Sequence, residues 1–204
     1  MENDPKEWTA GSFGDRPRMR PGRIGNPHHQ LPHESIDSRQ PQVQFRIVGP
    51  EDRATLTEIF SDIDGTFFRP HAFSPEVARR IAEYSGADVY AILLDGGSPV
   101  AYGMLRGWDE GYSTPSVGIA VRIGARRKGY GRLLMAHLHG VARARGAIQL
   151  RLRVHPNNVG ARRLYESIGY VYHGEDRGEF VMVIDAEAGR DPEIGQSPGG
   201  SSAD

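Results

Sequence analysis

The chain has 204 residues, which is enough for one domain of ordinary size with additional terminal segments. Its residues are 38% hydrophobic and 25% charged, as in proteins with an apolar core, and its net charge of -1 argues against a nucleic-acid-binding domain. Because the sequence contains no cysteine, it excludes disulfides, a thiolate nucleophile and cysteine-ligated metals.

Signals for export or membrane insertion are missing from the sequence. No apolar run approaches the length of about 20 residues that spans a bilayer. The first residues, MENDPKEWTAGSFGDRPRMR, contain no apolar segment of the kind found in secretory signals. We therefore expect a cytoplasmic protein with no membrane partner and no nucleic-acid partner.

Residues 1–42 are rich in Pro, Gly, Arg and His and show no apolar periodicity, and residues 186–204 have a similar composition. Such segments cannot bury enough apolar surface to offset the entropy lost on ordering, so we expect two disordered tails. The basic run at 16–23 could contact a polyanion, but its composition favours a solvated tail. One domain is predicted over residues 43–185.

The first half of this domain begins with a strand at 43–49, where apolar and polar residues alternate. Pro50 then opens a helix that extends to Ile63 with one apolar face. The segment DGTFFRPHAF at 64–73 is predicted to be a loop. Ser74 is predicted to cap a second helix that reaches Tyr84.

Three strands and a helix follow in the middle of the chain. The runs at 88–95 and 99–107 are joined by a Gly-Gly-Ser turn, which is typical of a hairpin, and a third strand is expected at 116–121. The apolar positions of residues 129–145 recur with the spacing of a helix.

The last third contains a strictly alternating strand at 148–154 and a helix at 158–168 that Gly169 terminates. Two further strands at 170–173 and 179–185 form a closing hairpin. The predicted order is βααβββαβαββ, which indicates an α/β fold with a mixed sheet.

The segment GARRKGYG joins the third strand of the middle group to the long helix. A strand that enters a helix through a glycine-rich turn leaves unpaired backbone N–H groups at the positive end of the helix dipole, which suits an anion such as a pyrophosphate. Glycines at 129 and 131 would let the anion approach the backbone, and the basic residues at 126–128 add positive charge. By itself this segment also fits a plain turn.

Two known phosphate loops do not match this segment. A P-loop needs Lys and then Ser or Thr directly after its second glycine, but Tyr130 and Gly131 follow Gly129. A dinucleotide-binding loop needs a third glycine, which GYGRLL lacks.

A second motif follows about 30 residues later. The spacing R-x-x-G-x-G at 126–131, followed by N-x-x-A-x-x-x-Y-x-x-x-G-Y at 158–170, resembles the two signatures of the GCN5-related N-acetyltransferases (GNAT). The resemblance covers residues 43–185 in the order of elements and 116–170 in residue motifs. It implies the GNAT-type fold, a mixed and mostly antiparallel sheet flanked by helices, with acetyl-CoA as the acyl donor.

The resemblance assigns the pyrophosphate to the backbone at 126–131 and the pantetheine arm and thioester to the strand before it. It also assigns Asn158 to the cofactor arm and the hydroxyl of Tyr165 to the neighbourhood of the sulfur. The expected cofactor-binding residues are Ile119, Ala120, Val121, Arg126, Arg127, Lys128, Gly129, Tyr130, Gly131, Arg132, Asn158 and Tyr165.

Tyr165 is the candidate general acid, because a phenol can donate a proton to the departing thiolate, whereas a buried core aromatic is the structural alternative. The strand at 116–121 contains no carboxylate, although many family members have a Glu there. Asp109 and Glu110 are therefore the candidate bases for the amine, and a solvated turn is the alternative reading of these two residues.

The acceptor is expected between the first two helices, in the family's usual position. The candidate substrate-binding residues are Phe68, Arg69, His71, Trp108, Tyr112 and His155. The aromatic residues could instead fix the loop to the core, and the two histidines could be ordinary turn residues. No metal site is expected, because the histidines have no recognisable ligand spacing.

The sequence thus predicts an N-acetyltransferase that acts on a primary amine of a small molecule, with an amino sugar as the favoured acceptor. A protein N-terminal or lysine acetyltransferase is one alternative. A non-catalytic acyl-CoA-binding module is another, although the presence of Tyr165 and Asn158 argues against it. The expected assembly is a monomer or a homodimer.

Overall fold

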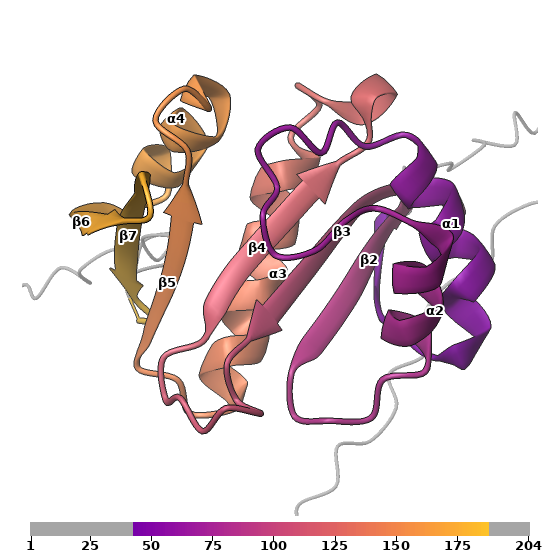
Figure 1. The fold of residues 1–204 in the computed structure, drawn as a ribbon, viewed down its shortest axis with the longest axis horizontal. Helices are drawn as coiled ribbons and strands as arrows, with labels where there is room; N and C mark the ends of the chain where they lie inside the picture. The colour runs from indigo at the N-terminus through magenta and orange to yellow at the C-terminus, as the bar shows by residue number, and fades with distance from the viewer. Residues whose placement is uncertain (1–42, 188–204) are drawn as a thin grey trace, which may run out of the picture. The chain divides into compact units, whose positions relative to one another are not determined.

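The computed structural model describes residues 43–187 (Figure 1). The predicted tails at 1–42 and 186–204 lie outside the described residues, except for Ala186 and Glu187. Within the described part of the chain, no helix combines the length and the apolar character needed to cross a membrane.

The strands and α-helices follow the predicted order βααβββαβαββ. Two short 3₁₀ helices, which the sequence did not predict, precede α1 and α3. The elements are β1 (Val43–Ile47), η1 (Pro50–Asp52), α1 (Arg53–Ser61), α2 (Pro75–Ala82), β2 (Val89–Asp95), β3 (Ser98–Arg106), β4 (Ser116–Val121), η2 (Ile123–Ala125), α3 (Tyr130–Ala144), β5 (Gln149–Val154), α4 (Val159–Ser167), β6 (Val171–Asp176) and β7 (Glu179–Asp185).

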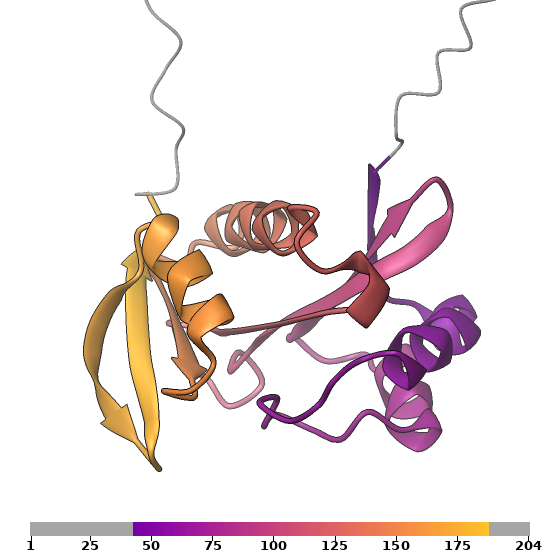
Figure 2. The ribbon, with the colours of Figure 1, turned by 90° about the horizontal axis from the view of Figure 1, so that it is seen from above.

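All seven strands belong to one sheet with the order β1-β2-β3-β4-β5-β7-β6. Neighbouring strands are antiparallel except for β4 and β5, so the predicted mostly antiparallel sheet is confirmed. The parallel pair is joined only at Ser116 and Arg151, after which the two strands diverge (Figure 1). Seen from above, β6 and β7 run at a steep angle to β3 and β4 (Figure 2). The sheet therefore has two arms, a first arm of β1–β4 and a second arm of β5–β7, and the gap between them opens toward the end of β4.

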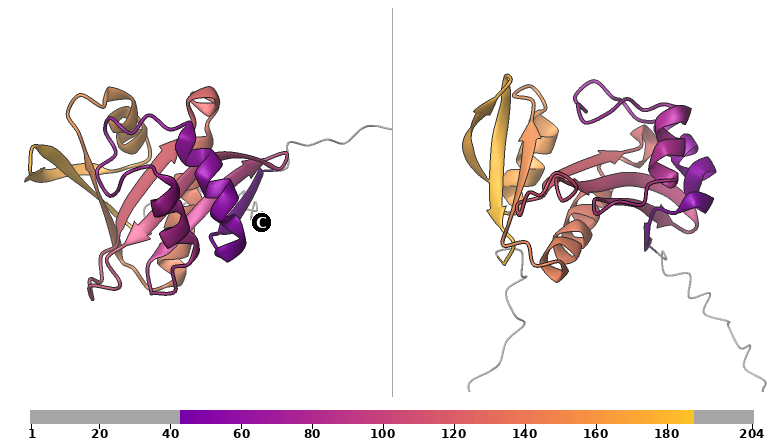
Figure 3. Two further views of the ribbon diagram at one scale, coloured as in Figure 1. Left: turned by 45° about the vertical axis from the view of Figure 1, so that its right-hand side comes forward. Right: turned by 60° about the horizontal axis from the view of Figure 1, so that its bottom comes forward.

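Helices cover both faces of the first arm. Alternate residues of a strand point to opposite faces, and β2 follows this rule: Ile92 packs with α1 and α2, whereas Leu93 packs with α3. Figure 3 shows α1 and α2 on one side of the sheet and α3 on the other. The larger core continues from α3 under both arms to Leu150 and Leu152 of β5.

The helix ends have the signals that the sequence predicted. The Ser74 hydroxyl accepts from the N–H of Val77 at 3.3 Å and caps α2, with Pro75 in the first turn. After α4, Gly169 adopts a φ of 99°, a left-handed conformation that costs glycine little. These two residues mark where α2 begins and where α4 gives way to the following hairpin.

Candidate functional site

The gap between β4 and β5 is the first part of the site. The N–H of Arg151 donates to the carbonyl of Pro115 at 3.1 Å, so the odd-numbered residues of β4 direct their backbone groups toward β5. Because pairing ends at Ser116, the amides of Ile119 and Val121 face the opening without a strand partner. The intervening Ala120 pairs with Tyr102 of β3.

The segment after β4 presents a row of free N–H donors. Gly129 caps α3 with a φ of 87°, and Arg127 also has a positive φ of 66°. Leu133 is the first residue of α3 whose N–H is bonded within the helix, to the carbonyl of Gly129 at 3.1 Å. Within residues 43–187, the N–H groups of residues 127–132 have no acceptor. Donors at the positive end of a 15-residue helix form a site for an anion.

The side chains around this anion site divide into free and bound groups. Arg127 and Lys128 are exposed and have no ion pair in the described part of the chain. Arg126 pairs with Asp64 at 3.6 Å, and Arg132 donates to the hydroxyl of Ser167 in α4 at 2.6 Å. The hydroxyl of Tyr130 donates to Asp95, which raises the pKa of Tyr130.

Arg122 anchors the segment at its start. Its guanidinium pairs with Glu58 at 2.7 Å and with Asp62 at 2.9 Å, both at the end of α1. The carbonyl of Asp62 also accepts from the N–H of Ile123 at 3.0 Å. Sequence reasoning missed these residues, because no local pattern relates positions that lie about 60 residues apart.

Helix α4 borders the gap from the side of β5. A Cβ added to Gly131 would lie 3.2 Å from Leu164 and 3.7 Å from Ile119, so α3, α4 and β4 meet closely at this point. The amide oxygen of Asn158 accepts from the N–H of Ala161 at 3.3 Å, which leaves the side-chain NH₂ group free. This free NH₂ group is available to a ligand.

Tyr165, near the end of α4, is almost fully buried, and burial raises its pKa to about 12. Its ring packs against Tyr170, with the ring centroids 5.8 Å apart. The hydroxyl has no hydrogen-bond partner among the described residues, yet it is not one of their fully enclosed polar atoms. It is therefore a protonated donor that open space can reach.

Part of the loop between α1 and α2 turns inward. Phe68 and His71 form an aromatic cluster with Phe60, Phe73 and Tyr102. The Nδ1 atom of His71 lies 2.9 Å from the carbonyl of Ala72, so Nδ1 carries the proton and Nε2 accepts from the hydroxyl of Tyr102 at 3.0 Å. Burial lowers the pKa of His71, and the nearby guanidinium groups of Arg106 and Arg80 lower it further.

The tip of the same loop meets the other arm of the sheet. Phe67 lies against His155, which follows β5, with the ring centroids 5.1 Å apart. Arg69 is exposed and has no partner in the described chain. The loop thus connects the two arms across the gap.

The remaining predicted residues lie at the opposite end of β4, in the segment that joins β3 to β4. Trp108 packs against the core beneath the guanidinium of Arg145, and Tyr112 is 65% exposed. Asp109 accepts from the hydroxyl of Tyr84 and from the N–H of Ala87, and its pKa is lowered mainly by the Tyr84 hydrogen bond.

Glu110 pairs with Arg106 at 3.7 Å. The structure therefore does not bring the two candidate bases to Tyr165. Their role as bases stays a prediction.

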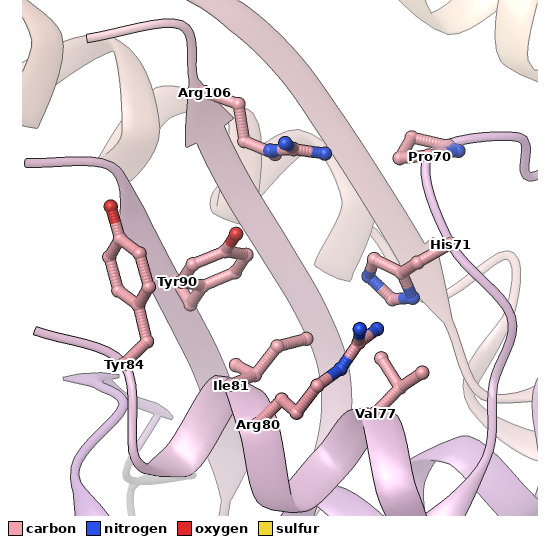
Figure 4. Close-up of a pocket in the computed structure, with 8 residues that line it drawn as sticks. All are labelled: Pro70, His71, Val77, Arg80, Ile81, Tyr84, Tyr90 and Arg106. Atoms are coloured by element: carbon pink, nitrogen blue, oxygen red, sulfur yellow. The ribbon is translucent and has the colours of Figure 1, made fainter. Parts of the chain in front are cut away.

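A pocket of about 290 Å³ lies on the face that α1 and α2 cover (Figure 4). It is lined by Pro70, His71, Val77, Arg80, Ile81, Tyr84, Tyr90 and Arg106. Of these, only His71 was a candidate in the sequence, because the others are spread from the loop before α2 to the end of β3 and share no motif. Among the described residues, no group of three or more His, Asp or Glu side chains is arranged to hold a metal ion.

Solved structures share this fold at low sequence identity. PaiA N-acetyltransferase from Thermoplasma acidophilum, solved in complex with coenzyme A, is 15% identical over 70% of this chain and 98% of its own, with a TM-score of 0.59. Aminoglycoside acetyltransferase AAC(6′)-Ib, also solved in complex with coenzyme A, is 19% identical over 72% and 96%, with a TM-score of 0.59.

The ribosomal-protein-S18-alanine N-acetyltransferase from Escherichia coli is 19% identical over 76% of this chain and 97% of its own, with a TM-score of 0.56. At these identities the likeness establishes the fold alone. No curated protein matches the sequence significantly. The profile of the Acetyltransferase (GNAT) family matches residues 55–170, more than half of the chain. The chain therefore belongs to the GNAT acetyltransferase family and is an acyltransferase.

Proposed function

We propose that this protein transfers the acetyl group of acetyl-CoA to a primary amine of a small molecule, with amino sugars as the first class of acceptor to test. One observation carries the proposal: the free N–H groups of residues 127–132 and the unpaired amides at the end of β4 border one opening in the sheet, and α4, which contains Tyr165, meets α3 and β4 there. Membership of the family makes acetyl-CoA the acyl donor.

We expect the cofactor to lie along this opening. The pyrophosphate would lie against the N–H groups at the start of α3, with Arg127 and Lys128 at its rim. The pantetheine arm, which contains amides, would pair with the free N–H groups of Ile119 and Val121 and reach the NH₂ group of Asn158. The carbonyl of Val121 already accepts from Nε of Arg126 at 3.4 Å. This arrangement directs the thioester toward Tyr165.

The chemistry is a direct attack on the thioester. The neutral amine nitrogen forms a bond to the acetyl carbon, and the resulting oxyanion accepts a hydrogen bond from a β4 amide. The carbon–sulfur bond then breaks, and Tyr165 donates its proton to the thiolate. The nitrogen loses one proton to solvent and the tyrosine regains one, so the products are the N-acetyl amide and CoA.

The amine proton needs a path out of the site. The carboxylates of Asp109 and Glu110 are bound to Tyr84 and Arg106 at the opposite end of β4. We propose that water carries the proton away from the amine, and that either carboxylate could act as the base only through such water. If Glu110→Gln lowered kcat at neutral pH more than about tenfold, Glu110 would belong to the proton path, and an unchanged kcat would mean that it does not.

A CoA-release assay tests the function. The full chain is incubated with acetyl-CoA and a panel of amino sugars, aminoglycosides, polyamines, amino acids and peptides. We expect amine-dependent release of CoA and an acetylated product by mass spectrometry for a small-molecule amine. Turnover confined to peptides would make the protein a peptide acetyltransferase. Binding of acetyl-CoA with no turnover on any amine would make it a non-catalytic acyl-CoA-binding module.

A further inference from the structure

We propose that the acceptor carries an anionic group, a carboxylate or a phosphate, which binds between Arg80 and Arg106 in the pocket beside β3. This inference rests on the proposed function, since it names the chemical class of the amine. The pocket of about 290 Å³ has room for a group of this kind together with part of a small metabolite.

Two cations enter the pocket from different elements. Arg80 extends from α2 and Arg106 from the end of β3, and both guanidinium groups lie on the side of His71 (Figure 4). The lining contains no Asp or Glu. Burial lowers the pKa of His71, so this side chain is neutral. The positive charge of the lining therefore comes from the two arginines.

The charge of Arg80 is not used to stabilise the described part of the chain. Within residues 43–187 it forms no hydrogen bond and no ion pair. Its neighbour Arg79 differs, because it pairs with Glu83 at 2.7 Å along α2 and does not line the pocket. A cation at the edge of a pocket with no protein partner is available to a ligand anion.

Arg106 is held in place while remaining available. Its Nε atom lies 3.5 Å from the buried carboxylate of Asp88, whose other oxygen accepts from the N–H groups of Gly107 and Trp108 at 2.8 and 2.9 Å. The contact with Glu110 is long, 3.7 Å, and both side chains are exposed, at 38% and 50%. Exposed ion pairs contribute little, so a ligand anion can replace Glu110.

The pocket is placed to serve the reaction. In the β3–β4 register, Arg106 pairs with Ser116 and Tyr102 pairs with Ala120. The His71 end, bonded to the hydroxyl of Tyr102, therefore lies level with the half of β4 whose amides are free. An acceptor whose anion binds between the two guanidinium groups, on the side of His71, would therefore hold its amine near that half.

Matched acceptor pairs test the inference in the full chain. Glucosamine 6-phosphate is compared with glucosamine, and lysine with lysinamide, which separates a phosphate from a carboxylate. Binding is measured by calorimetry with saturating CoA present, so that the pyrophosphate site is occupied, and turnover is measured by CoA release. We expect the member with the anionic group in at least one pair to bind, and to react in kcat/KM, about tenfold or more better than the member without it.

Variants identify the site. Arg80→Ala and Arg106→Gln should each abolish the roughly tenfold preference for the anionic member of a pair. Arg79→Ala, the matched control, should leave this preference unchanged. Since Arg80 is exposed and unpartnered, its replacement should not affect folding. Equal loss in Arg79→Ala and Arg80→Ala would contradict a specific site.

The outcomes separate this inference from the proposed function. Equal binding and turnover of the members with and without the anionic group in both pairs overturns the anion site and leaves the acetyltransferase function standing. Arg80-dependent binding of an anionic member without CoA release from any amine overturns the proposed function and leaves the anion site standing. If none of the four compounds binds, the inference is wrong.

Discussion

The phenol of Tyr165 has properties that suit proton donation more than packing. A hydroxyl that only filled the core would be expected to have a partner, because buried polar groups are almost always hydrogen-bonded. This hydroxyl has none among the described residues, and its pKa of about 12 keeps it protonated at any physiological pH. We therefore interpret it as a group held ready for a ligand atom.

Replacement of Tyr165 by Phe should lower kcat about 10²- to 10⁴-fold, because the leaving thiolate would lose its proton donor. The affinity for CoA should change little, since the ring and its packing remain. Steady-state kinetics at saturating substrates together with CoA titration would measure both effects. An unchanged kcat in Tyr165→Phe would show that the hydroxyl has no part in the chemical step.

The glycine-rich segment shows what could be predicted residue by residue. The spacing of Gly129 and Gly131 indicated donors at a helix start, and the N–H groups there are free. By contrast, Arg80 and Arg106 belong to an ordinary helix and strand, and only the tertiary fold brings them to one pocket. The local spacing of residues in the sequence cannot predict that two such distant side chains line the same pocket.

At the scale of elements, the predictions were accurate wherever one period dominated. The strictly alternating residues 149–154 form the strand β5, as predicted. The residues with helical apolar spacing form α3 from Tyr130 to Ala144. The single bridge between β4 and β5 was not predictable, because strand register depends on partners far away in the sequence. The short helix η2 was also missed; Arg122, its N-cap, joins it to Glu58 and Asp62 near the end of α1.

Because Arg122 joins the end of α1 to the start of the segment at 123–132, which we propose binds the pyrophosphate, Arg122→Ala should loosen that segment. We expect KM for acetyl-CoA to rise about five- to tenfold with a smaller change in kcat, and the free energy of unfolding to fall by about 1 kcal/mol. Kinetics and urea unfolding measure the two effects. Arg79→Ala, which removes a different exposed ion pair, is the control, and an equal rise in KM there would contradict the anchoring role.

Helix α3 also contains a buried histidine. The ring of His139 lies 3.0 Å from the hydroxyl of Tyr170, and burial lowers its pKa to about 4, with a further contribution from Arg143. Since the unfolded chain has a histidine pKa near 6.5, it binds the proton first as the pH falls. Stability is therefore full above about pH 6.5 and is lost as the pH falls toward 4.

Urea unfolding at pH 7 and pH 4.5 should show this loss. The wild-type protein should lose about 2 kcal/mol more than His139→Gln between the two values, because the variant cannot titrate at this position while all other groups still can. A pH dependence of the same size in both proteins would mean that His139 is not protonated on unfolding.

At the scale of the whole molecule, the two arms of the sheet share little direct pairing. A cofactor that contacts both the start of α3 and α4 would join them. We expect CoA at 100 times its Kd to raise the free energy of unfolding by about 2.7 kcal/mol and the melting temperature by about 5–10 °C. Thermal unfolding with and without CoA measures this shift, and no shift despite calorimetric binding would mean that CoA binds the unfolded chain equally well.

The opening between β4 and β5 also determines which molecules can pair with it. Free strand amides at the outer edge of a sheet attract other chains and promote aggregation. Here the free amides of Ile119 and Val121 lie inside the sheet, bordered by α3 and α4 and spanned by the contact of Phe67 with His155. A second polypeptide strand cannot reach this interior edge, whereas a narrow unbranched chain with its own amides can. The fold thus leaves strand N–H groups unpaired for a narrow ligand without the aggregation risk of an unpaired strand at the outer edge of the sheet.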